Sequence, residues 1–187
     1  MHQDSWSLKA KKMGYRSRAV FKLEEILLKL HKNQINKVLD LGSAPGGWSQ
    51  FIINKYPHSK IIAVDILHME PIDGVQFIKK NIEDIDSIQL INSQKGKFDL
   101  VISDIAPNLT GMSAVDNENI YELNKITINL ANIYLSEASS AVVIKTFQNS
   151  NFKSLKKEME LFFKIVQTYK PAASKNKSAE TYLYGAR

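Results

Sequence analysis

The segment 37–50, KVLDLGSAPGGWSQ, limits the possible folds more than any other part of the chain. It opens with an apolar run of strand length, Val38, Leu39 and Leu41 around Asp40, and closes with apolar residues at helical spacing. Between them lie three glycines, Gly42, Gly46 and Gly47. Glycine lets the backbone turn tightly and lets a ligand approach it closely, and the first N–H groups of a helix have no partner within that helix. The segment therefore predicts a strand, a ligand-binding loop and a helix.

The acid at the end of the next apolar run indicates a nucleoside ligand. The loop 42–47 departs from the GxGxxG spacing of dinucleotide dehydrogenases. Asp65 lies eighteen residues after Gly47 and ends the run 61–64. An acid at the tip of a second strand binds the two ribose hydroxyls in the dinucleotide fold. The glycines alone fit any α/β protein, but together with Asp65 they favour an adenosine cofactor with little phosphate, for which S-adenosyl-L-methionine (SAM) is the candidate.

Length and composition predict a single domain over residues 1–187, since this length supports one sizeable core. The chain has no cysteine, which excludes disulfides and favours an intracellular setting. Its four histidines are scattered, so we expect no metal site. No apolar run approaches the length of a membrane span, and the first residues lack the apolar core of a signal peptide.

The positive charge is concentrated at the N-terminus. The whole chain carries +6, and residues 1–37 hold nine Lys or Arg against three acids. We expect residues 1–36 to form a basic helical extension. Basic side chains interleaved with Trp6 and Tyr15 suggest an arm that contacts nucleic-acid phosphates, with a solvated basic tail as the alternative. The candidate RNA-binding residues are Lys9, Lys11, Lys12, Arg16 and Arg18.

The rest of the extension predicts an amphipathic helix that Ser17 caps and that ends at Leu30. Apolar residues at spacings of three and four form its buried stripe. Lys22 lies off that stripe, so the pattern alone makes it a solvent-facing lysine. The stripe consists of Val20, Leu23, Leu27 and Leu30.

Beyond the glycine loop, strands and helices alternate, which predicts a parallel sheet with helices on both faces. The further strands are expected at 60–65, 75–78, 98–103, 142–144, 165–169 and 181–184. The helices are expected near 84–92, from a cap at Asp116 to Tyr134, and over 152–163.

Three charged residues stand where strands begin or end. Asp104 follows the run 100–102, at the edge of an open α/β sheet where ligands bind, although acids also commonly begin loops. Lys145 directly follows three β-branched residues and should be half buried, and a buried ammonium is costly without a partner. Glu180 ends the polar connector 170–180 at a strand boundary. The loop 105–115 between these elements should lie close to the ligands.

With these residues collected, the chain resembles the FtsJ family of SAM-dependent RNA 2′-O-ribose methyltransferases over nearly its full length. The resemblance implies a Rossmann-like methyltransferase fold, with a seven-stranded, mostly parallel sheet and an antiparallel C-terminal strand. It also implies a catalytic tetrad of Lys22, Asp104, Lys145 and Glu180, which overturns the pattern-only interpretation of Lys22. The stretches that carry it are LKAKKMGYRSRAVFKLEEI, VLDLGSAPGGWSQ, ISDIAPNLTG, VVIKTFQ and KPAASKNKSAETYLYG.

The same resemblance implies a cofactor site for SAM, with S-adenosyl-L-homocysteine as the product and no metal required. Family members commonly carry an aspartate where this chain has Asn81, near the adenine. An amide still donates and accepts hydrogen bonds, and Glu83 or Asp84 could serve instead. With the loop glycines included, the expected cofactor-binding residues are Gly42, Gly46, Gly47, Trp48, Asp65, Asn81 and Asp104.

The implied reaction is an in-line attack of a ribose 2′-oxygen on the sulfonium methyl group, with the enzyme aligning the reactants and removing a proton. Lys145 is either the general base or the group that orients the oxygen. An unperturbed lysine has a pKa of about 10.4. Acids at Asp104 and Glu180 would hold its proton, whereas burial and the charge of Lys22 would oppose this, so both roles stay open.

The stretches most similar to the family favour a uridine of large-subunit ribosomal RNA, in the subunit or its precursor. We also expect a monomeric enzyme. A tRNA methyltransferase of the same family is the first alternative. A non-catalytic RNA-binding factor for ribosome assembly is the second, and the intact tetrad counts against it. The loop spacing disfavours a nicotinamide oxidoreductase.

Overall fold

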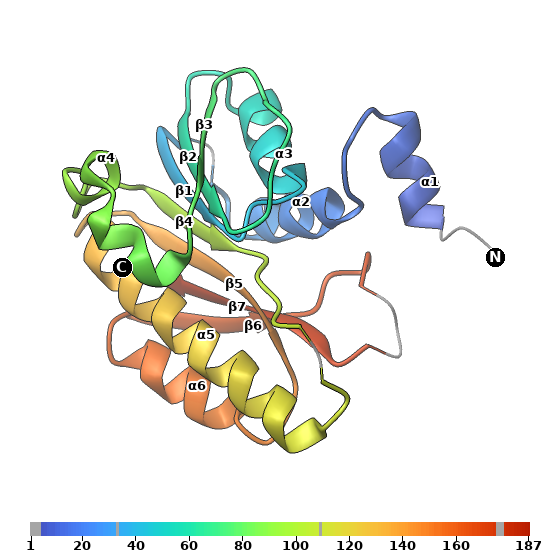
Figure 1. Ribbon diagram of the computed structural model, residues 1–187, viewed down its shortest axis with the longest axis vertical. Helices are drawn as coiled ribbons and strands as arrows, with labels where there is room; N and C mark the ends of the chain where they lie inside the picture. Colours follow the sequence, from blue (N-terminus) through green and yellow to red (C-terminus); the bar gives the residue numbers. More distant parts are fainter. Residues whose placement is uncertain (1–4, 33, 109, 175–177) are drawn as a thin grey trace.

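The structure is a computed structural model that describes residues 5–32, 34–108, 110–174 and 178–187. One seven-stranded sheet runs through it in the order β3-β2-β1-β4-β5-β7-β6 (Figure 1). Neighbours from β3 to β5 pair in parallel, whereas β7 pairs antiparallel with β5 and β6. The predicted mostly parallel sheet with an antiparallel C-terminal strand is therefore confirmed. The strands are β1 (Lys37–Leu41), β2 (Lys60–Asp65), β3 (Val75–Lys79), β4 (Leu100–Ser103), β5 (Ala141–Phe147), β6 (Ile165–Tyr169) and β7 (Glu180–Ala186).

Helices cover both faces of the sheet because successive strand side chains point to opposite sides. Val38 packs with the cluster under α2 and α3, and its neighbour Leu39 packs with the cluster under α5 and α6. Figure 1 shows these two pairs on opposite sides of the sheet. The helices are α1 (Ser5–Lys12), α2 (Ala19–Lys29), α3 (Gly47–Lys55), the 3-10 helix η1 (Ile82–Ser87), α4 (Gln89–Asn92), α5 (Ser113–Tyr134) and α6 (Phe152–Glu160).

Two helices start at other residues than predicted. Helix α2 begins at Ala19 with Arg18 at its N-cap, one residue after the predicted cap Ser17, although Ser17 Oγ still accepts a hydrogen bond from Ala19 N at 3.1 Å. Helix α5 begins three residues before Asp116, so Asp116 is not its cap. The Asp116 carboxylate instead accepts hydrogen bonds from Thr110 N, Thr110 Oγ1 and Gly111 N, and so holds the preceding loop against the helix. An acid beside a turn satisfies loop N–H groups as readily as helical ones.

The region predicted as one helix near 84–92 is two short pieces, η1 and α4. Helix α6 also ends three residues earlier than predicted, at Glu160. The strand predicted to begin at Phe98 begins at Leu100, and Phe98 forms an isolated parallel bridge with Leu135. These differences lie at element ends, where hydrogen bonding is local and periodicity is weakest.

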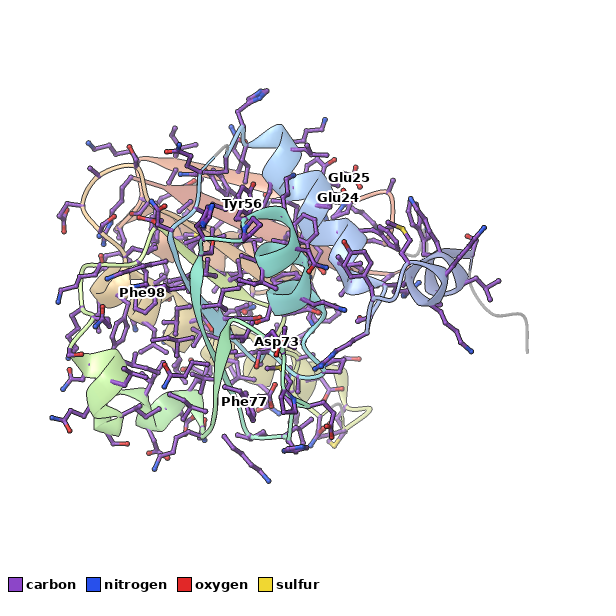
Figure 2. All side chains as sticks on the ribbon, turned by 90° about the horizontal axis from the view of Figure 1, so that it is seen from above. Glu24, Glu25, Tyr56, Asp73, Phe77 and Phe98 are labelled. Carbon is purple, nitrogen blue, oxygen red and sulfur yellow. The ribbon has the colours of Figure 1, made fainter. Side chains whose placement is uncertain are left out.

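Helix α1 extends away from the sheet and the other helices (Figure 2). It is held at one side by aromatic packing, because the rings of Trp6 and Phe21 lie 5.3 Å apart between centroids. Lys9 Nζ lies 4.6 Å from the Phe21 ring centroid. Within the described residues, no helix has the length and apolar character needed to cross a membrane.

Candidate active site

The four predicted tetrad residues meet as two ion pairs at one edge of the sheet. Lys22 Nζ lies 2.6 Å from Glu180 Oε1, and Lys145 Nζ lies 3.1 Å from Asp104 Oδ1. Lys145 also donates a hydrogen bond to the backbone oxygen of Asp104. The side chains of Lys22 and Lys145 are only 7% and 11% exposed, so each ammonium is buried next to its partner. The solvent-facing interpretation of Lys22 from its pattern is therefore wrong.

Strand order and register explain this meeting. Strands β1, β2, β4 and β5 run parallel, so Asp65, Asp104 and Lys145 fall at one edge. Strand β7 runs the other way, which brings its first residue, Glu180, to the same edge opposite Phe147. Helix α2 packs on this side of the sheet with buried Lys22 pointing inward.

Tyr182 connects the two ion pairs and was not predicted. Its hydroxyl lies 3.4 Å from Asp104 Oδ1 and 3.4 Å from Glu180 Oε1. The residue is fully buried and pairs in register with Lys145 across β5 and β7. Burial, together with the charges of Asp104 and Glu180, raises the pKa of Tyr182 well above its usual value, so the hydroxyl stays a donor. The sequence carries no signal for this role, because the pairing of Tyr182 with Lys145 depends on how β7 is placed in the sheet.

Glu180 is held in its charged form. Burial by itself would raise the pKa of Glu180, but the hydrogen bond and charge of Lys22 outweigh burial. Ser174 Oγ donates a further hydrogen bond to Glu180 Oε1 at 3.0 Å. The net result is a Glu180 pKa below its ordinary value, so this end of the site carries a fixed carboxylate at neutral pH.

The glycine loop after β1 has the backbone that its sequence requires. Gly42 and Gly46 have φ angles of +70° and +103°, a region that favours glycine. A Cβ on Gly46 would lie 2.7 Å from Ile72 Cδ1, because a second loop packs directly against it. Gly47 begins α3, so the free N–H groups of that helix face the loop as predicted.

Asp65 joins the two loops that follow β1 and β2. Its Oδ2 accepts a hydrogen bond from Ala44 N at 2.8 Å, and its Oδ1 accepts one from Leu67 N at 2.8 Å. A carboxylate offers about four acceptor positions, so capacity is left for a ligand hydroxyl.

A cavity of about 460 Å³ opens between these loops and the pair of Asp104 and Lys145, and Lys22 and Glu180 are not among its lining residues. It is bounded by Asp65 and Asn81 on one side and by Asp104 and Lys145 on the other. Asn81 also caps η1, accepting a hydrogen bond from Glu83 N at 3.2 Å. Glu83 and Asp84, the alternatives to Asn81, are not among the lining residues. Ile105 and Pro107 also line the cavity and belong to the loop expected near the ligands. Other lining residues were not predicted, among them Leu67 and two that directly follow strand ends, Ile66 and Lys80.

Trp48, expected at the cofactor, makes its polar side-chain contact with the protein itself. Its Nε1 donates a hydrogen bond to Ala19 O at 2.8 Å, and its ring lies 5.9 Å from that of Tyr182. The residue is 3% exposed, and the indole ties α3 to the start of α2 beside the tetrad.

Two buried oxygens near the glycine loop lack partners in the part of the chain that the structure describes: Asp40 Oδ1 and Ser43 Oγ. The other Asp40 oxygen accepts a hydrogen bond from Ser49 Oγ at 2.6 Å. Burial, with the charges of Asp104 and Asp65, raises the pKa of Asp40 to about 7 despite that hydrogen bond. Both unpartnered groups line a small cavity beside Gly42 and Asp104. Buried polar atoms without partners are rare, and these mark a place for a polar ligand group.

The basic residues of the N-terminal segment have different surroundings. Lys9, Lys11 and Lys12 are exposed on α1. Arg16 directs its guanidinium onto backbone oxygens of two loops. Arg18 is half-buried just before α2.

A larger cavity, of about 640 Å³, lies at the opposite end of the strands. It is lined by Lys37 and Lys60, the first residues of β1 and β2, and by Leu90 of α4. It touches none of the predicted site residues, so volume alone does not identify the site here. The described parts of the chain contain no group of three or more His, Cys, Asp or Glu arranged to hold a metal ion.

The chain is similar in sequence to known methyltransferases over most of its length. A family model described as FtsJ-like methyltransferase matches residues 15–187. A protein of Wigglesworthia glossinidia brevipalpis named "Ribosomal RNA large subunit methyltransferase E" is 38% identical, over 97% of this chain and 90% of that protein. A protein of the same name from Polaromonas naphthalenivorans is also 38% identical, over 97% of this chain and 80% of its own.

A solved structure agrees with these sequence matches. A crystal structure described as a ribosomal RNA methyltransferase from Plasmodium falciparum superposes with a TM-score of 0.78 at 29% identity, over 92% of this chain and 98% of that chain. Fold, sequence relatives and family model all agree. The chain belongs to the FtsJ-like methyltransferase family.

Proposed function

We propose that this methyltransferase transfers the methyl group of SAM to a ribose 2′-oxygen of large-subunit ribosomal RNA, in the subunit or its precursor. The observation that carries the proposal is the pairing of Lys145 with Asp104 at 3.1 Å in the wall of a ligand-sized cavity. The names of the relatives from Wigglesworthia and Polaromonas support the RNA substrate.

The residues around the cavity fit SAM. The volume of about 460 Å³ lies within the range of small-molecule sites. Asp65 would hold the ribose hydroxyls and Asn81 the adenine. Asp40 Oδ1 and Ser43 Oγ, in the small cavity that shares Gly42 and Asp104 with this one, offer an acceptor and a donor to the amino-acid end. When bound, SAM supplies a methyl group activated by its sulfonium charge.

Lys145 is placed to hold the attacking oxygen. Two of its N–H groups are directed to Asp104, one to the carboxylate and one to the backbone oxygen. The third position on the nitrogen is left for the ribose 2′-hydroxyl. As a neutral amine, Lys145 would offer a lone pair there and take the proton that the hydroxyl loses on methylation, while the sulfonium would leave as the neutral thioether of S-adenosyl-L-homocysteine. As an ammonium, it donates a hydrogen bond that orients the oxygen, and the proton leaves later to solvent.

Lys22 and Glu180 position the sugar on the other side of Tyr182. Their ion pair is buried on both partners, with side chains 7% and 16% exposed, so its geometry is fixed before the substrate arrives. Charged groups held in advance align a substrate without reorganising during the reaction. The exposed lysines of α1 would contact the RNA backbone away from the reacting sugar.

The test is methyl transfer from labelled SAM to large ribosomal particles and to total tRNA, with the labelled nucleotide mapped. A substrate carrying a 2′-deoxy sugar at that nucleotide is the matched control. We expect label in a large-subunit uridine, and none in the deoxy substrate. A rate that increases with pH would assign Lys145 as the base, and a flat profile would assign it to orientation.

Other outcomes redirect the proposal. Label in tRNA would keep the chemistry and change the substrate, and bound SAM with no label in any RNA would favour an assembly factor. Neither alternative is favoured by the comparisons, because the relatives are named methyltransferases of large-subunit ribosomal RNA.

A further inference from the structure

Two loops flank the cofactor cavity, and each contributes residues to its wall. The loop after β1 provides Gly42 and Ala44, and the loop after β2 provides Ile66 and Leu67. Asp73, which is labelled in Figure 2, marks the position of the loop after β2. On the inner side, the Asp65 carboxylate ties the loops together through Ala44 N and Leu67 N. The separation of the loops sets the width of the cavity at this point.

Arg16 ties the same two loops together on their outer side. Its Nη1 donates hydrogen bonds to Pro45 O at 3.2 Å and to Glu70 O at 2.6 Å, and its Nη2 donates to Pro71 O at 2.7 Å. All three acceptors are backbone oxygens, so the contacts depend on loop position. A planar guanidinium presents several donors in a rigid fork, which a lysine ammonium does not reproduce.

The loops are packed tightly where Arg16 grips them. A Cβ on Gly46 would lie 3.2 Å from Arg16 Nη1 and 3.0 Å from Met69 Sδ. The glycine therefore leaves room for both the guanidinium and the second loop. A shift of either loop would break contacts on the arginine and change the glycine loop beneath the cavity.

Helix α3 fixes the backbone from which Arg16 extends. Gln50 Oε1 accepts a hydrogen bond from Arg16 N at 3.0 Å, and Gln50 Nε2 donates one to Gly14 O at 2.9 Å. Arg16 lies between α1, which carries the exposed lysines, and α2, which carries Lys22. The arginine thus stands at the junction of the basic arm, the catalytic helix and the cofactor loops.

We propose that Arg16 is a positioning residue for SAM rather than a ligand for RNA phosphate. Its guanidinium holds the two loops at the separation that SAM requires, while Asp65 is left to bind the ribose. The inference rests on the proposed cofactor, and it replaces the RNA-binding role that the sequence suggested for Arg16.

The first test is SAM titration by calorimetry with RNA-free protein. Arg16→Lys keeps the positive charge but loses the planar set of guanidinium donors. Because hydrogen bonds from a charged donor are lost, we expect SAM to bind about 10-fold more weakly. The KM for SAM should increase by a similar factor, with kcat at saturating SAM retained. In Arg16→Gly, added methylguanidinium should restore SAM affinity and methylammonium should not. Lys153→Gln, on the exposed face of α6, is the control.

The second test is the salt dependence of binding to purified large-subunit ribosomal RNA. Arg16→Gln should keep the wild-type slope of log K against log salt, whereas Lys12→Gln should reduce it by about 0.7 to 0.9, the effect of one lost phosphate contact. A reduced slope in Arg16→Gln, or wild-type SAM affinity in Arg16→Lys, would overturn the assignment.

Hydrogen exchange separates this inference from the proposed function. In ligand-free Arg16→Lys, amides in residues 42–50 and 66–74 should exchange faster than in the wild type, with the rest of the sheet unchanged. If the wild type binds no SAM, SAM is excluded as the cofactor, but the exchange result still decides whether Arg16 holds the two loops together. Unchanged exchange in both segments would contradict the inference.

Discussion

Lys22 and Glu180 form a buried ion pair across 158 residues of sequence, with 2.6 Å between Nζ and Oε1. Removing one partner leaves the other charge buried, which costs roughly 3 kcal/mol. We therefore expect Lys22→Met to lower the free energy of unfolding by about that amount. Lys22→Met combined with Glu180→Gln should lose less than the sum of the two single changes. Urea unfolding of the three variants checks this, and strictly additive losses would contradict the coupling.

The ion pair of Lys22 and Glu180 also predicts that the stability of the fold depends on pH. The pKa of Glu180 is lowered in the folded protein, so its contribution is present above the unfolded value of about 4.3 and is lost as pH falls through the lower folded value. The stability difference between the wild type and Lys22→Met should therefore shrink below about pH 4. Thermal unfolding from pH 3 to 7 measures it, and a constant difference would exclude a charged pair.

Replacing Lys145 should separate catalysis from cofactor binding. Lys145→Ala removes the group that the proposed mechanism places at the attacking oxygen, so methyl transfer should fall by at least about 100-fold. SAM affinity should stay at the wild-type value, since Asp65 and Asn81 still line the cavity. Single-turnover transfer and calorimetric titration provide the two readouts, with Lys153→Ala on α6 as the control. Loss of SAM binding in Lys145→Ala would show that the lysine is structural.

Much of this site could be predicted because strand ends are visible in a sequence. Asp65, Asp104 and Lys145 each close an apolar run, and parallel strands bring such residues to one edge, although β5 continues two residues beyond Lys145, to Phe147. Lys22 could not be placed in this way. Its helix shows an apolar stripe that excludes it, and its partner lies on a strand whose position depends on the complete sheet.

Contacts between loops also could not be predicted from the sequence. Arg16 looked like the other basic residues of the arm, and only the packing of two loops reveals its three carbonyl acceptors. Asp116 looked like a helix cap, but Thr110 and Gly111 use its carboxylate. Short polar side chains satisfy whichever N–H groups the fold brings near, and sequence periodicity does not report these.

The raised pKa of Asp40 predicts that stability changes with pH in the opposite direction to the change that Glu180 causes. Burial raises its pKa to about 7, so the folded protein binds a proton that the unfolded chain releases near pH 4. Stability of the ligand-free protein should therefore fall as pH rises from about 4 to 7, by roughly 4 kcal/mol at most. Asp40→Asn should remove this part of the profile. Parallel pH curves for the two proteins would show that Asp40 titrates normally.

Tyr182 should affect the rate more than the fold. Tyr182→Phe keeps the ring that packs against Trp48 and removes the hydroxyl placed between Asp104 and Glu180. The hydroxyl lies 3.4 Å from each carboxylate oxygen, which is long for a hydrogen bond, so we expect a loss in kcat of only about 3- to 10-fold. Near-UV circular dichroism should not change. A wild-type kcat with a loosened tertiary spectrum would assign Tyr182 to packing alone.

The exposed lysines of α1 should contribute to RNA affinity through phosphate contacts. Lys9 lies against Trp6 and Phe21, so replacing it would also disturb packing, whereas neither Lys11 nor Lys12 has such a ring contact among the residues that the structure describes. Lys11→Gln with Lys12→Gln should reduce the salt slope of ribosomal RNA binding by about 0.7 to 0.9 per lysine. Lys153→Gln with Lys157→Gln, on the exposed side of α6, removes the same charge elsewhere and should leave the slope unchanged. Equal reductions in the two double variants would mean that net charge, rather than the arm, attracts the RNA.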